Sequence, residues 1–248
     1  MTSFSVLLKK ELRDHLRTYK LLIIVAFFLL LGFGTPLLLH YLPSLLDGDT
    51  PIPIPDFTAA DVVGEYLESI TQIGILVVIL VAMGAVARER ERGTAVMTLS
   101  KPVGRGIFIA SKLAALSVTF GLGLAGGAVA CYLYASILFG ELNGLSFIAA
   151  SLLVGLFFLV CLSVTLLCST LFKSQLAAGG LALAIIVGLW AFSFVPQLDL
   201  YAPMGVISWG QRIIAGSGPS AWWAVSISLG LVVLSAVLAW QTLVRKEL

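Results

Sequence analysis

Residues 151–172 read SLLVGLFFLVCLSVTLLCSTLF, a run that contains no charged side chain. An α-helix rises 1.5 Å per residue, so about 20 apolar residues are needed to cross about 30 Å of hydrocarbon. A strand of a membrane β-barrel would instead alternate apolar and polar residues over about 10 positions. This run is continuous, as is LLIIVAFFLLLGF at 21–33, and both predict membrane-spanning helices.

The composition extends this prediction to the whole chain. Hydrophobic residues make up 59% of the 248 positions and charged residues only 11%, whereas soluble domains carry about 25% charged residues. We therefore predict an all-α integral membrane protein with six transmembrane helices, at 21–42, 69–87, 107–138, 146–171, 176–195 and 222–244. The third span exceeds the hydrocarbon thickness, so we expect it to tilt or to extend its Lys112 end into water.

The distribution of basic residues predicts the orientation of these helices. All but one of the 15 Lys and Arg residues fall on one side of the predicted spans, and Arg212 alone falls on the other. The positive-inside rule makes the basic side cytoplasmic. Both termini are then cytoplasmic, as an even number of crossings requires, and we expect a multi-pass protein of the plasma membrane.

Residues 1–20 form a separate segment before the first span. Its apolar residues recur at near-helical spacing, with basic residues elsewhere on the cylinder: Phe4, Leu8, Leu12, Leu16 and Tyr19. This pattern is typical of an amphipathic helix in the headgroup layer, with a solvated charged tail as the alternative. The apolar run that follows is longer than the core of a secretory signal, and no A-x-A-like site follows it, so we expect a permanent span.

The stretch RERERGTAVMTLSKPVGR at 88–105 lies between two predicted spans. A charged side chain at the bilayer centre costs about 3 kcal/mol, so this stretch must be a cytoplasmic connection. Flanking basic residues are expected in any membrane protein, but Glu89 and Glu91 contribute little to topology. The pair Gly93-Thr94 indicates a turn, the amphipathic stretch after it a short helix, and Pro102 the end of that helix. A short charged helix in water is a surface for a partner.

Four stretches of this chain resemble segments of the ABC transporter type-2 permease family. ARERERGTAVMTLSKPVGRGIFIASK at 87–112 is similar to its cytoplasmic segment, and KKELRDHLR at 9–17 to its amphipathic elbow helix. YAPMGVISWGQRIIAG at 201–216 resembles its re-entrant outer piece before the last span, and VRKEL at 244–248 its terminal tail. The closest subgroup includes the permeases of copper maturation and of gliding motility.

The resemblance implies a fold and a set of partners. With the spans predicted above, it implies an elbow helix at 1–20 and a transmembrane domain at 21–248, with an outer loop at 43–68, a cytoplasmic coupling loop at 88–106 and an outer re-entrant segment at 196–221. It also implies a coupling helix between the second and third spans that docks on a separate ATPase. The implied ATPase-coupling residues are Glu89, Glu91, Gly93, Thr94, Pro102 and Arg105. Two ATPase copies and a second permease copy, identical or similar, complete the expected assembly.

This chain contains no G-x-x-x-x-G-K-[ST] motif, so we expect no cofactor of its own and place ATP and Mg on the partner ATPase. Ion-driven carriers need ionisable groups near the midplane, and the predicted spans hold none there. The cysteines at 131, 161 and 168 form no C-x-x-C or Cys/His cluster, so no metal site is expected. Neither a catalytic residue set nor a nucleic-acid partner is predicted.

The predicted function is that of an exporting permease subunit, not an enzyme by itself. Two alternatives remain at this point. One is a non-transporting subunit that transmits force or serves as a scaffold for an extracytoplasmic partner, because the outer loop at 43–68 is long. The other is a membrane-embedded enzyme, which would need a catalytic constellation that the sequence lacks.

Strips of small residues predict where helices pack closely. The third span carries Gly123 and Gly127 and the fifth Gly180 and Gly188, each at four-residue spacing or a multiple of it. Packing within the subunit is favoured over packing against a second copy. Hydroxyl residues near the cysteines are expected to bond to their own helix, with a weakly polar cavity as the alternative: Ser163, Thr165, Ser169 and Thr170.

Overall fold

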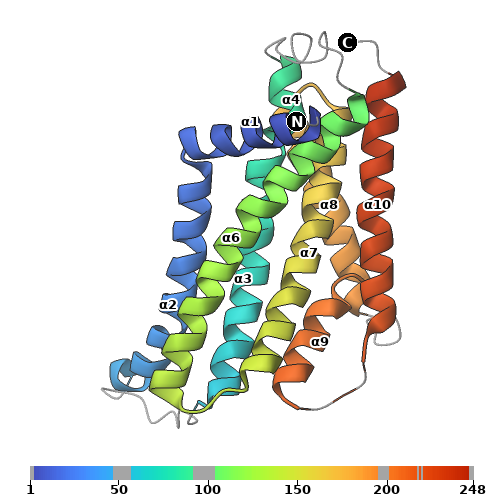
Figure 1. Cartoon of the computed structure of the whole chain (residues 1–248). Helices are drawn as coiled ribbons and strands as arrows, with labels where there is room; N and C mark the ends of the chain where they lie inside the picture. Colours follow the sequence, from blue (N-terminus) through green and yellow to red (C-terminus); the bar gives the residue numbers. More distant parts are fainter. Residues whose placement is uncertain are drawn as a thin grey trace.

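The computed structural model describes residues 3–46, 57–91, 104–194, 201–216, 218 and 220–245, and all regular structure in these ranges is helical. In chain order (Figure 1), the elements are α1 (Ser3–Arg17), α2 (Lys20–Leu46), α3 (Ala59–Ala82), α4 (Gly84–Glu91), α6 (Arg105–Phe139), α7 (Gly144–Leu171), α8 (Gln175–Ala191), the 3₁₀ turn η1 (Phe192–Phe194), α9 (Gly205–Ile214) and α10 (Trp222–Arg245).

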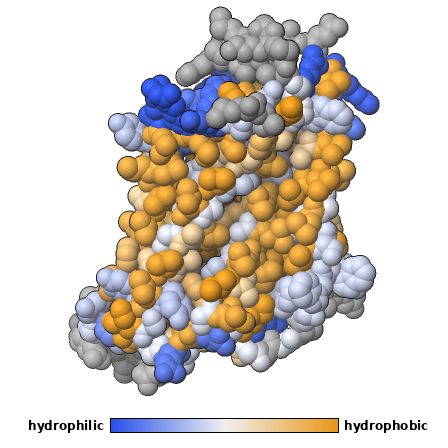
Figure 2. Space-filling model, viewed as in Figure 1, coloured by the Kyte–Doolittle hydropathy of each residue, from blue (hydrophilic) through white to orange (hydrophobic). Residues whose placement is uncertain are grey.

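The predicted all-helical membrane class is confirmed. The described residues contain 5 helices that are long and apolar enough to span a membrane: α2, α3 continued by α4, α6, α7 and α10. The predicted span at 176–195 corresponds to α8, a shorter apolar helix of 17 residues that runs into η1. Apolar side chains form a broad band across the face of the molecule seen in Figure 2, as a hydrocarbon surrounding requires.

Helix α7 is the central element of the bundle. It contacts α3, α6, α8, α9 and α10, while α2 packs mainly on α6. The main core is built from apolar side chains of these helices, including Phe28, Tyr66 and Phe158, which are all but fully buried. Helix α1 lies across the end of the bundle, nearly perpendicular to the long helices (Figure 1).

The small-residue strip of α6 packs against α2 of the same chain. A Cβ built on Gly127 would lie 2.5 Å from the carbonyl oxygen of Phe28, and one on Gly32 would lie 2.3 Å from the carbonyl oxygen of Gly127. Backbones that approach this closely leave no room for any side chain. Gly180 and Gly188 of α8 behave differently, because a Cβ on either would meet nothing within 4 Å.

Helix α3 begins ten positions earlier than the predicted second span. Thr58 accepts a hydrogen bond from the amide of Asp61, and the Asp61 carboxylate accepts one from the amide of Thr58, which forms a capping box. The acidic residues within the predicted loop, Asp61, Glu65 and Glu68, lie on the exposed face of the helix. The predicted outer loop at 43–68 is therefore wrong in extent, since α2 runs to Leu46 and α3 starts at Ala59.

Helix α9 lies within the outer segment predicted at 196–221. Its buried face consists of Gly205, Val206, Ile207 and Gly210 and packs on α7. Trp209 of α9 and Trp222 at the start of α10 contact edge to face, with ring centroids 5.0 Å apart. The segment therefore contains an amphipathic helix seated against the bundle.

Candidate functional site

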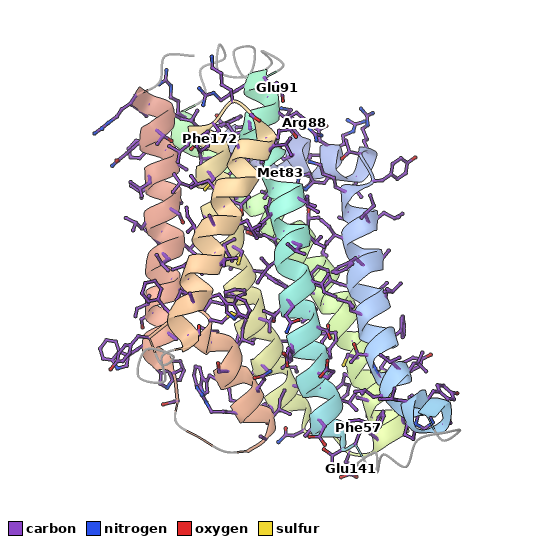
Figure 3. All side chains as sticks on the ribbon, turned by 180° about the vertical axis from the view of Figure 1, so that it is seen from behind. Phe57, Met83, Arg88, Glu91, Glu141 and Phe172 are labelled. Carbon is purple, nitrogen blue, oxygen red and sulfur yellow. The ribbon has the colours of Figure 1, made fainter. Side chains whose placement is uncertain are left out.

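Polar contacts between helices are concentrated at one end of the bundle, which we term the basic end. Here α1, α4, the start of α6 and the end of α10 come together (Figure 1). Arg88 and Glu91 lie at this end together with Met83 and Phe172, whereas Phe57 and Glu141 lie at the opposite end (Figure 3). The basic end is the part of the molecule that carries the predicted coupling residues.

A serine of α7 caps the first turn of α4. The amides of Val86 and Ala87 donate hydrogen bonds of 3.0 and 2.9 Å to Ser169 Oγ, which itself donates to the carbonyl oxygen of Met83 at 2.7 Å. The first amides of a helix have no partner within the helix, so a side chain must supply one. Ser169 supplies it from another helix and thereby fastens the junction of α3 and α4 to α7.

Further along α4, charged side chains of alternating sign form hydrogen bonds to the end of α7 and to the start of α8. Arg90 Nη1 donates to the carbonyl oxygen of Thr170 at 2.7 Å, in the last turn of α7, where a cation is favoured by the helix dipole. Gln175, the first residue of α8, accepts from Arg88 and donates through Nε2 to Glu91 Oε2 at 3.1 Å. The exposed side of α4 is thus tied to two helices at once.

Lys112 of α6 lies at the centre of a buried ion cluster. Its Nζ is 3.1 Å from Glu11 Oε2 of α1 and 2.8 Å from Glu89 Oε1 of α4. The nitrogen also lies 5.0 Å from the centroid of the Phe108 ring. Two carboxylates and an aromatic face therefore replace water around this ammonium group.

Of the two outcomes expected for the third span, the extension of Lys112 into water is wrong, because its side chain is only 3% exposed, whereas α6 does run obliquely across the bundle (Figure 1). The sequence-based expectation treated the residue as isolated at the end of a long span. In the fold, α1 lies over that end and brings Glu11 to it, while α4 brings Glu89. The cluster joins α1, α4 and α6 through one atom.

His15 lies beside this cluster on the buried face of α1. Its Nδ1 is 2.8 Å from Thr119 Oγ1, and the Thr119 hydroxyl donates to the carbonyl oxygen of Ala115 at 2.8 Å. Since the Thr119 hydroxyl already donates its proton to Ala115, Thr119 Oγ1 accepts in the contact with His15. The neutral imidazole must therefore carry its proton on Nδ1 and donate it to Thr119 Oγ1. Burial is the main reason that the pKa of His15 is lowered from 6.5 to about 4, and the positive charge of Lys20 is the next. The ring is therefore neutral near pH 7.

Arg105 binds the other end of the connecting segment to the bundle. Its Nη1 donates to the carbonyl oxygens of Leu243 and Val244, at 2.7 and 2.8 Å, in the last turn of α10. These carbonyls have no amide partner within their helix. The start of α6 is therefore held to the end of α10, and Thr170 and Thr242 add a hydroxyl contact of 2.8 Å between α7 and α10.

The structure places the predicted coupling residues as follows. Glu89, Glu91 and Arg105 all contact other helices of their own chain, whereas Gly93, Thr94 and Pro102 lie outside the described residues. Sequence reasoning missed Glu11, His15 and Ser169 as members of this site. A Glu and a His four residues apart on the otherwise apolar side of an amphipathic helix were the available signal.

The described polar groups of this site make contacts between helices. In the described residues no group of three His, Cys, Asp or Glu side chains could hold a metal ion. Every named polar group of the site instead joins one helix to another. A displacement of α4 would therefore be transmitted to α1, α6, α7 and α8.

Comparison with known proteins places this arrangement in a family. The model of the ABC-2 family of transporter proteins matches residues 5–205, a range that begins in α1 and ends at the start of α9. The chain belongs to the ABC-2 transporter family.

A second comparison matches almost the whole chain. The uncharacterized transmembrane protein YxlG of Bacillus subtilis strain 168 is 26% identical over 247 residues, which cover 96% of this chain and 95% of that protein. Membership of the ABC-2 family makes the chain a multi-pass membrane subunit of a transporter. Permeases of this family work with a cytoplasmic ATPase subunit, which is consistent with a chain that is not an enzyme by itself.

Proposed function

We propose that this chain is the permease subunit of an ATP-binding-cassette exporter, and that α4 passes the motion of a cytoplasmic ATPase to the transmembrane helices. The basic end is cytoplasmic in this proposal, together with both termini, as the positive-inside rule indicates. The ATPase holds ATP and Mg. It docks on residues 92–103, where Gly93, Thr94 and Pro102 form the coupling surface.

The observation that carries this proposal is the anchoring of both flanks of residues 92–103. On one side, Ser169 and Arg90 bind α4 to α7, and Glu89 binds it to Lys112 of α6. On the other side, Arg105 binds the start of α6 to α10. A force that reaches α4 or the start of α6 from this segment is therefore passed through these contacts to the helices packed against them.

The assembly follows from the same proposal. Two ATPase copies act on two permease copies, identical or similar, so that each copy of α4 is moved by one ATPase subunit. Helix α9 lies in the outer leaflet as the amphipathic part of a re-entrant segment, and α1 is the elbow helix in the inner headgroup layer. The absence of acidic and basic side chains from the middle of α2, α7 and α8 supports an energy source outside the spans.

Cross-linking tests the docking surface. Thr94→Cys should form a cross-link to a co-expressed ATP-binding-cassette ATPase, and Asn143→Cys, at the other end of the bundle, should not. The natural cysteines are buried, so the introduced thiol is the reactive one. Equal cross-linking of both variants, or of neither, would overturn the docking proposal.

Transport direction needs its own assay. Inverted membrane vesicles that contain the permease and the ATPase are incubated with a total cell extract, with and without ATP. Compounds that enter the vesicles only with ATP indicate export, because the cytoplasmic face is outside. Compounds lost from preloaded vesicles with ATP would indicate import and would refute the proposed direction.

A further inference from the structure

Helix α1 presents two different long faces. One face carries Leu7, Glu11 and His15 and is buried against the bundle. Beside it runs an apolar row, in which Leu8 and Leu12 are half-buried and Leu16 is exposed, and next to that row lie the exposed Lys9 and Arg13. A groove of about 440 Å³ follows these two rows.

The composition of this outer face indicates what covers it. Leu16 is 59% exposed and Val6 is 54% exposed, although both are large apolar side chains. Lys9, Lys10, Arg13 and Arg17 are exposed on the same helix, against one exposed acid, Asp14. An apolar row beside a basic row at the rim of the hydrocarbon belt is complementary to an acyl chain joined to an anionic headgroup.

We propose that the outer face of α1 is a binding site for an anionic phospholipid of the leaflet at the basic end. The acyl chain lies along Leu8, Leu12 and Leu16, and the phosphate is bound between Lys9 and Arg13. The lipid then holds α1 against the bundle, with Glu11 on the opposite face within reach of Lys112. This proposal concerns binding and does not depend on the proposed function.

Lipid retention by the intact protein tests the proposal. Full-length protein in nanodiscs that mix phosphatidylglycerol and phosphatidylcholine is released and weighed by native mass spectrometry. The natural protein should retain phosphatidylglycerol preferentially. Each basic residue near an anionic lipid is worth about fivefold in affinity, so Lys9→Gln with Arg13→Gln should lower retention about 25-fold.

The matched control removes two other basic residues of the same end. Lys173→Gln with Arg245→Gln changes the net charge equally but leaves α1 intact, and should retain phosphatidylglycerol within twofold of the natural protein. Equal loss in both double variants would mean that the effect is general charge attraction, and the site would be refuted. Retention of both lipids to the same degree would refute it as well.

Two further experiments distinguish a bound lipid from other occupants of the site, and neither depends on the folding of the double variant. Inorganic phosphate at millimolar concentration should leave bound phosphatidylglycerol in place, and displacement would point to a site for the phosphate ion alone. A nitroxide on Leu16→Cys should report the depth of the headgroup boundary in the nanodisc. Full accessibility to a water-soluble relaxation agent would overturn the proposal, because the apolar row would then face water.

Discussion

The ammonium nitrogen of Lys112 lies 2.8 Å from a carboxylate oxygen of Glu89, across 23 positions of sequence that include residues 92–103. The two residues flank the segment that we propose as the docking surface, one in α4 and one in α6. Their contact joins α4 to α6 on the two sides of that segment. The predictions below test the contacts that hold the helices together at the basic end and along α6.

Lys112→Met should destabilise the protein strongly. The change leaves Glu11 and Glu89 without their buried cation, and removal of one partner of a buried ion pair costs about 3–5 kcal/mol. Thermal unfolding in detergent measures the effect. The control is Lys10→Met, because Lys10 is 45% exposed and 3.7 Å from the same Glu11, and should cost at most about 1 kcal/mol. Similar losses in the two variants would contradict a buried cluster.

Ser169→Ala should loosen α4. The change removes the acceptor of the Val86 and Ala87 amides, and an unsatisfied buried donor costs about 1–3 kcal/mol. Hydrogen exchange of these two amides should accelerate. The control is Ser136→Ala, since Ser136 bonds only to carbonyls of its own helix and should change stability by less than about 1 kcal/mol. Unchanged exchange at α4 would show that another group caps it.

The stability of the protein should fall as the pH is lowered through the range in which His15 titrates. In the folded state the pKa of His15 is about 4, below its ordinary value of 6.5, so the unfolded state binds more protons between these values. The free energy of unfolding then decreases with falling pH, by about 2 kcal/mol from pH 7 to pH 5. Melting temperatures of the natural protein and His15→Asn across this range measure the contribution of this one group. Parallel curves would contradict a neutral, buried His15.

Gly127→Ala and Gly188→Ala should differ, although both replace a glycine of a small-residue strip. A Cβ at Gly127 would lie 2.5 Å from the Phe28 carbonyl oxygen, so α2 must shift, and overpacking costs about 1–3 kcal/mol. At Gly188 nothing lies within 4 Å, and the higher helix propensity of alanine should stabilise by up to about 1 kcal/mol. Thermal unfolding compares them. A larger loss at Gly188 would mean that α8, not α6, has the tighter contact.

Much of the helical architecture could be predicted because the bilayer constrains it. A backbone in hydrocarbon must form its hydrogen bonds internally, and an α-helix does so within one segment. Each long apolar run therefore predicts a helix. The same reasoning found α7 and α10 within a few residues, but it began the second span too late, at 69, because it assigned Asp61 and Glu65 to the preceding loop. Only the packing of the other face, with Val62 and Tyr66 buried, shows that these turns belong to α3.

The coupling site was predicted in part. The prediction that Ser163 and Thr165 bond to their own helix is confirmed by contacts to Val160 and Cys161. The same prediction was wrong for Ser169, which donates to Met83 of another element. A hydroxyl one turn from the end of its helix can reach a neighbouring helix, and nothing local to the sequence tells these positions apart.

The sequence alone determined that this protein is a bundle of membrane helices with a basic end, because hydropathy and charge act residue by residue and require no knowledge of neighbours. Only the tertiary structure decided which charges face solvent and which face one another. Lys112 and Glu11 are 101 positions apart, and they meet because α1 lies across the end of α6. Long-range electrostatic pairing depends on the distance between atoms, and that distance exists only once the helices have packed.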